Sequence, residues 1–418
     1  MKLRRWFIIV LLALSCTAPV LASPLEEGLD AMEREDFVKG VEILLPLAKQ
    51  GDLMASFVMG MAYDDGMGVK KNPQEAAKWY GPPAREGHPK SQYLLGKLLF
   101  YTEGPLQDPK EALRLFRLAA DQGEAEAQFM LGMEYLKGEL LPADHPEGLR
   151  LVRLAAEQGE EKAQFIMGEV YIDGKYGEKA DPAQGMNWYR QSAGQGMVLA
   201  QLALGKRYLK GENSPDDPAE AIRWMTLAAG QGDVEAKAIL GGMLVGFDPP
   251  HREVQKGVET LKQAAQGGHV LAYFFLGKFY LDGIGVQADP VEAALWIRPA
   301  AEKGYAEAQF ELAKMNHQGL GMPKNPKESS RWALRAAEQG HPSAQTVIGV
   351  NYLAGNGVEQ DPIKAFQWLT LSQDKIPEES RRQTAPLLEK LSAALPPEVK
   401  EEAMQHIRAW KPRRELKD

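Results

Sequence analysis

A glycine that recurs every 36 residues is the feature that most constrains how this chain can fold. The series holds nine glycines, and the spacing changes only once, to 37. Its members are Gly51, Gly87, Gly123, Gly159, Gly196, Gly232, Gly268, Gly304 and Gly340. An alanine stands three residues before every one of them. A period of this length is typical of a solenoid, in which stacked copies of one unit bury a continuous core.

Other residues also recur at fixed positions within the unit. A second glycine follows the first by nine residues in eight of the nine units, and Ala313 takes its place in the remaining one. Six of the eight tryptophans share a third position: Trp79, Trp188, Trp224, Trp296, Trp332 and Trp368. Small residues let two helix axes approach closely, and large side chains fill the volume that remains. We therefore interpret the inner glycines as close helix contacts and the aromatic residues as core.

Each unit is predicted to form two helices. Asp or Asn followed by Pro opens the second helix, because the polar side chain caps free amide groups and Pro suits the first turn. The capping residues are Asn72, Asp108, Asp181, Asp217, Asp289, Asn325 and Asp361. The recurring glycine ends the second helix in a left-handed conformation that other residues resist. Prolines inside second helices are expected to bend or shorten them; they are Pro46, Pro82, Pro83 and Pro299.

The repeated pattern resembles Sel1-like repeats, which are relatives of the tetratricopeptide class. One unit carries it almost without gaps, at Ala272, Leu276, Gly277, Tyr280, Gly283, Gly285, Val286, Asp289, Pro290, Ala293, Trp296, Ala300, Ala301 and Gly304. The resemblance covers about residues 36–373. It implies an all-α fold, a right-handed α-solenoid of about nine to ten helix-turn-helix repeats with helical caps. It also implies a protein-protein adaptor. Some exported relatives of the family act in envelope assembly, exopolysaccharide secretion or host contact.

The first 22 residues have the layout of a secretory signal peptide. A basic start formed by Lys2, Arg4 and Arg5 precedes an apolar stretch over residues 6–14, and small residues lead up to Ser23. The stretch is too short to span a membrane. The sequence thus predicts a signal peptide at 1–22, an N-terminal cap at 23–35, the solenoid at 36–373, and capping helices with a tail at 374–418. The expected location is periplasmic or secreted.

Cys16 is the only cysteine, and it leaves a second location open. It sits where the signal of an outer-membrane lipoprotein would place its acylated residue, although residues 13–15 match the usual pattern poorly. Cleavage after Ala22 removes three basic residues and no acidic ones, so the net charge changes from −8 to −11. Such a surface repels nucleic acid. We expect no nucleic acid partner and no membrane span, with a possible lipid anchor at Cys16.

Motifs for catalysis, cofactors and metals are missing from the sequence. It has no His-Glu-x-x-His, no Gly-x-Ser-x-Gly and no phosphate-binding glycine loop. His88, His269 and His341 share one position directly after the recurring glycine, two or five units apart, so they are interpreted as turn or helix-start residues. No catalytic, cofactor or metal site is therefore predicted.

The predicted function is a non-enzymatic scaffold or adaptor of the bacterial cell envelope that binds a partner protein on the concave face. Candidate contact residues are variable positions of the first helices: Lys97, Glu134, Glu169, Arg207, Phe279 and Asn351. The alternative is a cell-wall-related or β-lactamase-like hydrolase. It rests on cysteine-rich Sel1-like proteins described as penicillin-binding and on the pair Ser372 and Lys375, which has Ser-x-x-Lys spacing. The chain after residue 22 has no cysteine and does not match that subgroup.

Overall fold

The computed structural model describes residues 23–211, 217–246, 253–413 and 415. The predicted signal peptide and Cys16 lie outside the described residues. Within the described ranges the chain forms 22 helices and no strand. This confirms the predicted all-α solenoid of helix pairs.

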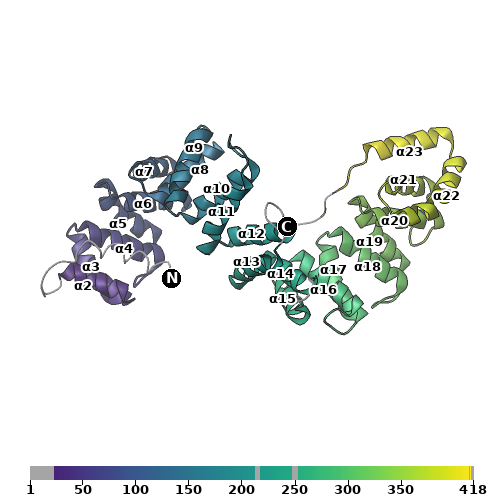
Figure 1. Ribbon diagram of the computed structural model, residues 1–418, viewed down its shortest axis with the longest axis horizontal. Helices are drawn as coiled ribbons and strands as arrows, with labels where there is room; N and C mark the ends of the chain where they lie inside the picture. Colours follow the sequence, from purple (N-terminus) through teal and green to yellow (C-terminus); the bar gives the residue numbers. More distant parts are fainter. Residues whose placement is uncertain (1–22, 212–216, 247–252, 414, 416–418) are drawn as a thin grey trace. The chain divides into compact units, whose positions relative to one another are not determined.

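The helices follow one another in pairs, and the chain divides into two compact units between Ala200 and Gln201. Consecutive helices lie side by side within each unit (Figure 1). The first unit contains α2 (Pro24–Glu33), α3 (Phe37–Lys49), α4 (Leu53–Asp65), α5 (Pro73–Arg85), α6 (Pro89–Tyr101), α7 (Pro109–Asp121), α8 (Ala125–Lys137), α9 (His145–Glu157), α10 (Glu161–Asp173) and α11 (Pro182–Gly194). The division falls within α12 (Val198–Lys210).

The second unit continues the same alternation. It contains α13 (Pro218–Gly230), α14 (Val234–Gly246), α15 (Val254–Gln266), α16 (Val270–Asp282), α17 (Pro290–Glu302), α18 (Ala306–Gln318), α19 (Pro326–Glu338), α20 (Pro342–Ala354), α21 (Pro362–Ser372), α22 (Glu378–Ala394) and α23 (Pro397–Ala409). From α4 to α21 the even-numbered helices are the first helices of the repeats and the odd-numbered ones the second. Among the described helices, none is long and apolar enough to cross a membrane.

The predicted helix ends are confirmed. All seven Asp or Asn residues before Pro are N-caps whose side chains accept backbone N–H bonds; the Asp181 carboxylate, for example, accepts from Gln184. All nine recurring glycines have positive φ, from +85° at Gly268 to +101° at Gly196. The N–H of Gly51 donates to the carbonyl of Ala48, and Asp52 donates to Leu47, which closes the helix end.

The inner glycines lie where a first helix touches the second helix of its own unit. A Cβ at Gly168 would lie 2.4 Å from the ring of Tyr189, and one at Gly60 would lie 2.5 Å from the ring of Tyr80. The space is therefore filled by the residue directly after the tryptophan position. In the unit where Ala313 replaces glycine, the residue at that position is Ala333, which needs the least room.

The inner prolines do not shorten their helices. The three helices that contain them, α3, α5 and α17, are 13 residues long, like most other helices of the repeats. The expectation of shorter helices was wrong, because a proline removes one hydrogen bond from a helix that packing on both neighbours holds in place.

Helices at both ends of the described chain close the repeat array. α2 packs on α3, where a Cβ at Gly28 would lie 2.6 Å from Leu44. At the other end, Leu391 of α22 and Ala403 of α23 share a buried cluster with Phe366 and Leu369 of α21. These helices occupy the segments that the sequence assigned to caps.

Candidate partner-binding surfaces

A buried glutamine recurs near the start of the first helices. Its Nε2 donates to the carbonyl of the alanine three residues before the recurring glycine, as Gln128 does to Ala120 at 3.3 Å. The other glutamines that make this bond are Gln92, Gln164, Gln309 and Gln345. All five are at most 5% exposed, so each bond satisfies a buried polar group.

A second glutamine, directly before the recurring glycine, connects neighbouring repeats. Its Nε2 donates to the Oε1 of the first glutamine about 30 residues earlier, at 2.8 or 2.9 Å. The pairs are Gln122 with Gln92, Gln158 with Gln128, Gln195 with Gln164, Gln231 with Gln201, and Gln339 with Gln309. We call this series the glutamine ladder.

The glutamine ladder is interrupted at α14 and α16. The position of the first glutamine is taken by Lys237 in α14 and by Tyr273 in α16, and their partner positions hold Gly267 and Lys303. The same region lacks the Asp-Pro pair and the tryptophan of the repeat around α15. This stretch is therefore where the chain departs furthest from its own pattern.

A groove of about 770 Å³ lies on the first-helix face at this interruption. It lies wholly within the second compact unit. Helix α14 contributes most of the lining, helped by its glycine at 242, which leaves open space where a side chain would stand. α16 contributes Leu271, Phe275 and Phe279. A mostly apolar concavity of this size is within the range of ligand sites.

Apolar side chains and a few polar groups meet in this groove. Leu271 and Phe275 are each 38% exposed, which is unusual for large apolar residues that face a cavity. His269 also lines the groove, and its Nδ1 is buried with no hydrogen-bond partner among the described residues. Burial lowers the pKa of His269. At the rim, Glu235 pairs with Lys206 at 2.6 Å. A partner could thus bury an apolar face here.

A buried charged cluster connects two first helices in the other compact unit. The ammonium of Lys90 lies 2.9 Å from Glu124, also pairs with Glu126, and lies 5.0 Å from the ring centre of Tyr93. Burial raises the pKa of Glu124 to about 7. Burial opposes ionisation of Glu126 too, but the hydrogen bond with Glu124 and the charge of Lys90 lower its pKa overall. Because these groups satisfy one another, the cluster is interpreted as a structural joint.

The shared histidine position has the predicted structural role. His88, His269 and His341 are the N-cap residues of α6, α16 and α20. The Nδ1 of His88 accepts from the backbone of Ser91, and that of His341 accepts from Ala344. Burial lowers the pKa of both histidines. Within the described residues no cluster of potential metal ligands was found.

The six candidate contact residues differ in how exposed they are. Lys97 pairs with Asp64 at 3.7 Å and is partly exposed, and Glu169 and Arg207 are half-buried. The other three are buried: Glu134, Phe279 and Asn351. Their burial has a common cause, because they stand two residues after the inner glycine, a position that faces the interior in most units. Only Phe279 lines the groove, so contact with a partner stays a prediction for the set.

Several of the buried candidates have internal roles. The amide of Asn351 donates to the hydroxyl of Ser330 at 2.8 Å, and burial raises the pKa of Glu134. The hydrolase motif is also internal, since Ser372 is fully buried and donates its hydroxyl to the carbonyl of Leu369. Lys375 lies 5.4 Å from the ring centre of Trp410. This arrangement offers no serine positioned to attack a substrate.

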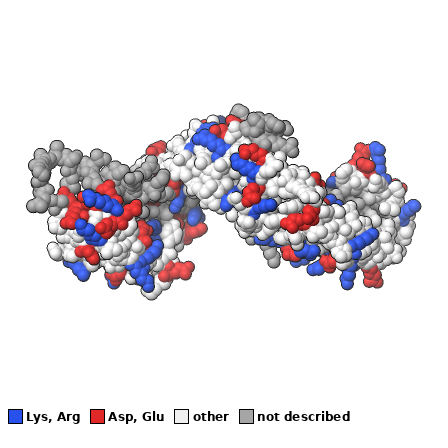
Figure 2. All heavy atoms as spheres, turned by 90° about the horizontal axis from the view of Figure 1, so that it is seen from below, with Lys and Arg blue, Asp and Glu red and all other residues white. Residues whose placement is uncertain are grey.

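Charges of both signs are mixed over the surface. On the face drawn in Figure 2, basic and acidic side chains lie among one another with uncharged areas between them. Many of the ion pairs in the described part of the chain join residues three or four positions apart on one helix, as Arg150 does with Glu147. Such pairs contribute little to stability.

Comparison with known proteins identifies a repeat family. The family model described as Sel1 repeat matches the residues 53–88, 89–124, 125–160, 161–197, 198–233, 270–305, 306–341 and 342–372, together more than half of the chain. Residues 234–269, which form α14 and α15, are not among these matches. The gap contains α14, where the glutamine ladder is interrupted and which contributes most of the groove lining, whereas α16 lies in a matched range. No curated protein matched the chain.

Two solved structures are similar over most of the chain. One is a protective antigen present in uropathogenic Escherichia coli strains that displays an SLR fold; it is 27% identical with a TM-score of 0.60, over 93% of this chain and 92% of that one. The other is a Sel1 repeat protein from Oxalobacter formigenes, 28% identical with a TM-score of 0.60, over 74% of this chain and 89% of that one.

Proposed function

The chain belongs to the Sel1 repeat family, and from that premise we propose that it is a non-enzymatic adaptor that binds a partner protein in the groove of α14 and α16. Proteins built from Sel1 repeats are generally protein-interaction scaffolds. The groove belongs to the face lined by first helices, which is the concave binding face of solenoid proteins.

The observation that carries this proposal is the coincidence of three departures from the repeat. At α14 the family pattern fails, the glutamine ladder is interrupted and a groove opens. Leu271 and Phe275 are exposed at the same place, where solvation alone favours polar residues.

The lining indicates what kind of segment would bind. Phe275 and Leu271 lie four residues apart on α16, so they form one ridge along the groove. An amphipathic helix of the partner could place its apolar side chains beside this ridge.

Site-specific crosslinking tests this proposal. A photoreactive amino acid in place of Phe275 is expected to capture a defined partner in living cells. The same photoreactive amino acid in place of Leu295 is not expected to capture it. Leu295 is a matched control because it is apolar and 62% exposed but belongs to the second helix α17. The purified partner should then bind the parent chain and lose binding to Phe275→Asp. Capture of the same proteins at both positions would contradict a dedicated groove.

Export from the cytoplasm is part of the same proposal. It is supported by the composition of residues 1–22 and by the similarity to a protein described as a protective antigen. Fractionation of cells that express the full chain, with sequencing of the mature N-terminus, is expected to find the protein outside the cytoplasm and starting at Ser23. A mature form that starts at an acylated Cys16 would instead establish the lipoprotein alternative.

A further inference from the structure

The tail after α23 returns to the repeats and lies across the end of α19. Trp410 and Pro412 lie over Gly340, where an added Cβ would be 3.5 and 3.4 Å from them. The N–H of Arg413 donates to the carbonyl of Glu338 at 2.9 Å, and that of Glu415 approaches the Oε1 of Gln339 at 3.4 Å. The tail is therefore held through its main chain, as an extended bound peptide would be.

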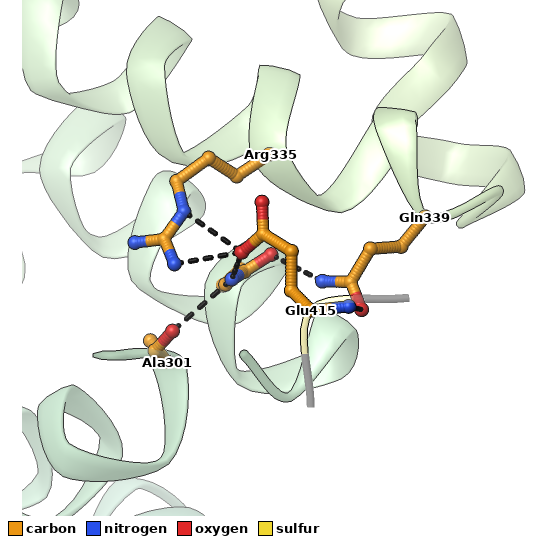
Figure 3. Close-up of polar contacts among 5 residues, drawn as sticks. Ala301, Arg335, Gln339 and Glu415 are labelled. Carbon is orange, nitrogen blue, oxygen red and sulfur yellow. Dashed lines mark hydrogen bonds and ion pairs between the residues drawn. The ribbon is translucent and has the colours of Figure 1, made fainter. Parts of the chain in front are cut away.

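The side chain of Glu415 is the anchor of this tail (Figure 3). One carboxylate oxygen accepts from Nε and Nη2 of Arg335, at 3.1 and 2.7 Å, and from Nε2 of Gln309 at 3.0 Å. Gln309 also donates to Ala301 and accepts from Gln339, so the carboxylate adds to a rung of the glutamine ladder. Burial would raise the pKa of Glu415, but the bonds from Arg335 and Gln309 lower it overall.

Only this repeat has the cation that such a site needs. Arg335 stands three residues after the tryptophan position, and none of the equivalent residues in the other units is charged. Those residues are Pro46, Pro82, Leu118, Leu154, Gln191, Leu227, Gln263, Pro299 and Leu371. The guanidinium lies 4.7 Å from the ring centre of Trp332, which holds it over the ladder. A fixed guanidinium beside amide donors is a strong carboxylate receptor.

We propose that Arg335, Gln309 and Gln339 form a docking site for a carboxylate in an extended peptide, and that Glu415 of the tail occupies this site as an internal competitor. The trans ligand is an extended segment with the chemistry of the tail, namely an apolar residue over Gly340 and a Glu three residues later. The tail then regulates access to this edge of the repeats. This inference deepens the proposed scaffold function and rests on it.

Binding of the tail sequence in trans tests the proposal. The probe is a fluorescent peptide with the sequence of residues 410–418, and the receptors are the full chain and its Glu415→Ala variant. The variant is expected to bind the peptide at least about ten-fold more tightly, because the internal competitor no longer fills the site. A peptide with Gln in place of its Glu should bind the variant at least about ten-fold more weakly.

A second variant assigns the binding to Arg335. The double variant Glu415→Ala/Arg335→Gln is expected to lose binding, while Glu415→Ala/Arg331→Gln, which changes a neighbouring exposed arginine, should keep it. Circular dichroism confirms that each receptor is folded. Equal binding to the parent chain and to Glu415→Ala would overturn the internal competition, and equal binding with and without Arg335 would overturn the site.

Two further measurements show whether a second copy supplies the carboxylate and whether the docking site can fail independently of the scaffold function. Mixing the Arg335→Gln chain, which keeps the tail, with the Glu415→Ala chain, which keeps the site, gives a heterodimer only if a second copy supplies the carboxylate. That result supports the site and names its occupant. If the tail peptide fails to bind while crosslinking at Phe275 still captures its partner, the docking site is rejected and the proposed scaffold function stands.

Discussion

At the scale of single residues, two adjacent glycines of α14 differ in whether packing requires them. Gly241 lies against α15, whereas Gly242 has open space around it. A Cβ at Gly241 would lie 2.8 Å from the carbonyl oxygen of Gly257 and 2.6 Å from Leu261, and backbone atoms cannot swing away. Gly241→Ala should therefore destabilise the protein by about 1–3 kcal/mol. Gly242 has open space around it, so Gly242→Ala should stabilise by about 0.5–1 kcal/mol through helix propensity.

Urea unfolding followed by circular dichroism measures both variants against the parent. Because the two positions are neighbours within one helix, the gain in helix propensity from Gly to Ala should be similar at both. Shifts of the same sign and size would contradict the packing of α14 on α15.

The histidine caps make stability depend on pH. His88 and His341 accept backbone bonds through Nδ1 and must be neutral to do so, and burial lowers their pKa below the ordinary value of 6.5. Their contribution is complete above pH 6.5 and is lost as the pH falls through the lowered pKa, because the unfolded chain takes up protons first.

The double variant His88→Asn/His341→Asn tests the histidine caps. Asn caps a helix without titrating, so the variant should lose less stability than the parent between about pH 7 and about pH 5.5. Unfolding midpoints at the two pH values give the comparison. His145→Asn is the control, since that histidine is exposed. The same loss in the parent and the double variant would show that other groups cause the pH dependence.

The residues that fix local conformation could be predicted from the sequence, and those that act across repeats could not. The left-handed glycines and the Asp-Pro caps obey rules that involve a few neighbouring residues. Burial of Asn351 and Glu134 depends on which way one helix faces in the stack. Variation at their position suggested contact with solvent, but Asn351 instead pairs with Ser330 inside the protein.

At the scale of helices, the glutamine ladder joins neighbouring repeats at five places. Gln128→Leu removes the donor to the Ala120 carbonyl, which keeps its bond from the Gly123 N–H, and the acceptor of the exposed Gln158. We expect a loss of about 0.5–1.5 kcal/mol, because two hydrogen bonds are lost but no buried group is left without a partner. Gln50, which also precedes a recurring glycine, is exposed, and Gln50→Leu should change stability by less than about 0.5 kcal/mol.

Thermal unfolding of the two glutamine variants shows whether the bonds of the ladder, and not only the exchange of Gln for Leu, affect stability. An equal change in both would mean that the ladder contributes nothing. The sequence did contain a sign of the ladder, because Gln occurs at both positions in several units and is missing from both near α14. Its meaning was hidden because the two side chains of a rung are about 30 residues apart, in different helices.

At the scale of the whole molecule, a repeat protein confines damage to neighbouring repeats. Lys90→Met leaves Glu124 and Glu126 without their buried cation and should cost about 1–3 kcal/mol locally, less than for a fully buried pair because the Glu126 side chain is 32% exposed. Hydrogen exchange is expected to speed up in α6 and α8 and to stay unchanged in α18 and α20. The triple variant Lys90→Met/Glu124→Gln/Glu126→Gln should recover part of the loss, because it removes the unpaired charges.

Faster hydrogen exchange over the entire chain in Lys90→Met would contradict this locality.

The fold class and most of the helix pairs could be predicted from the period of 36, since stacking needs only that every unit present the same faces. The groove and the tail did not follow from it. Both arise where the period ends or fails, and a periodic pattern contains no information about what replaces it.

The glutamine ladder has a consequence for how such a chain can change length. If residues 125–160 were deleted, Gln158 would be lost together with Gln128, and Gln195 would still donate to Gln164 in the stack that remains. Each duplication or loss of one whole unit therefore preserves every surviving rung. One repeat is then both the segment that a duplication or deletion would change and the segment that carries one set of ladder bonds. The array can therefore gain or lose repeats without leaving an interface unbonded. The stretch around α14 has no rungs to preserve, so this argument does not extend to it.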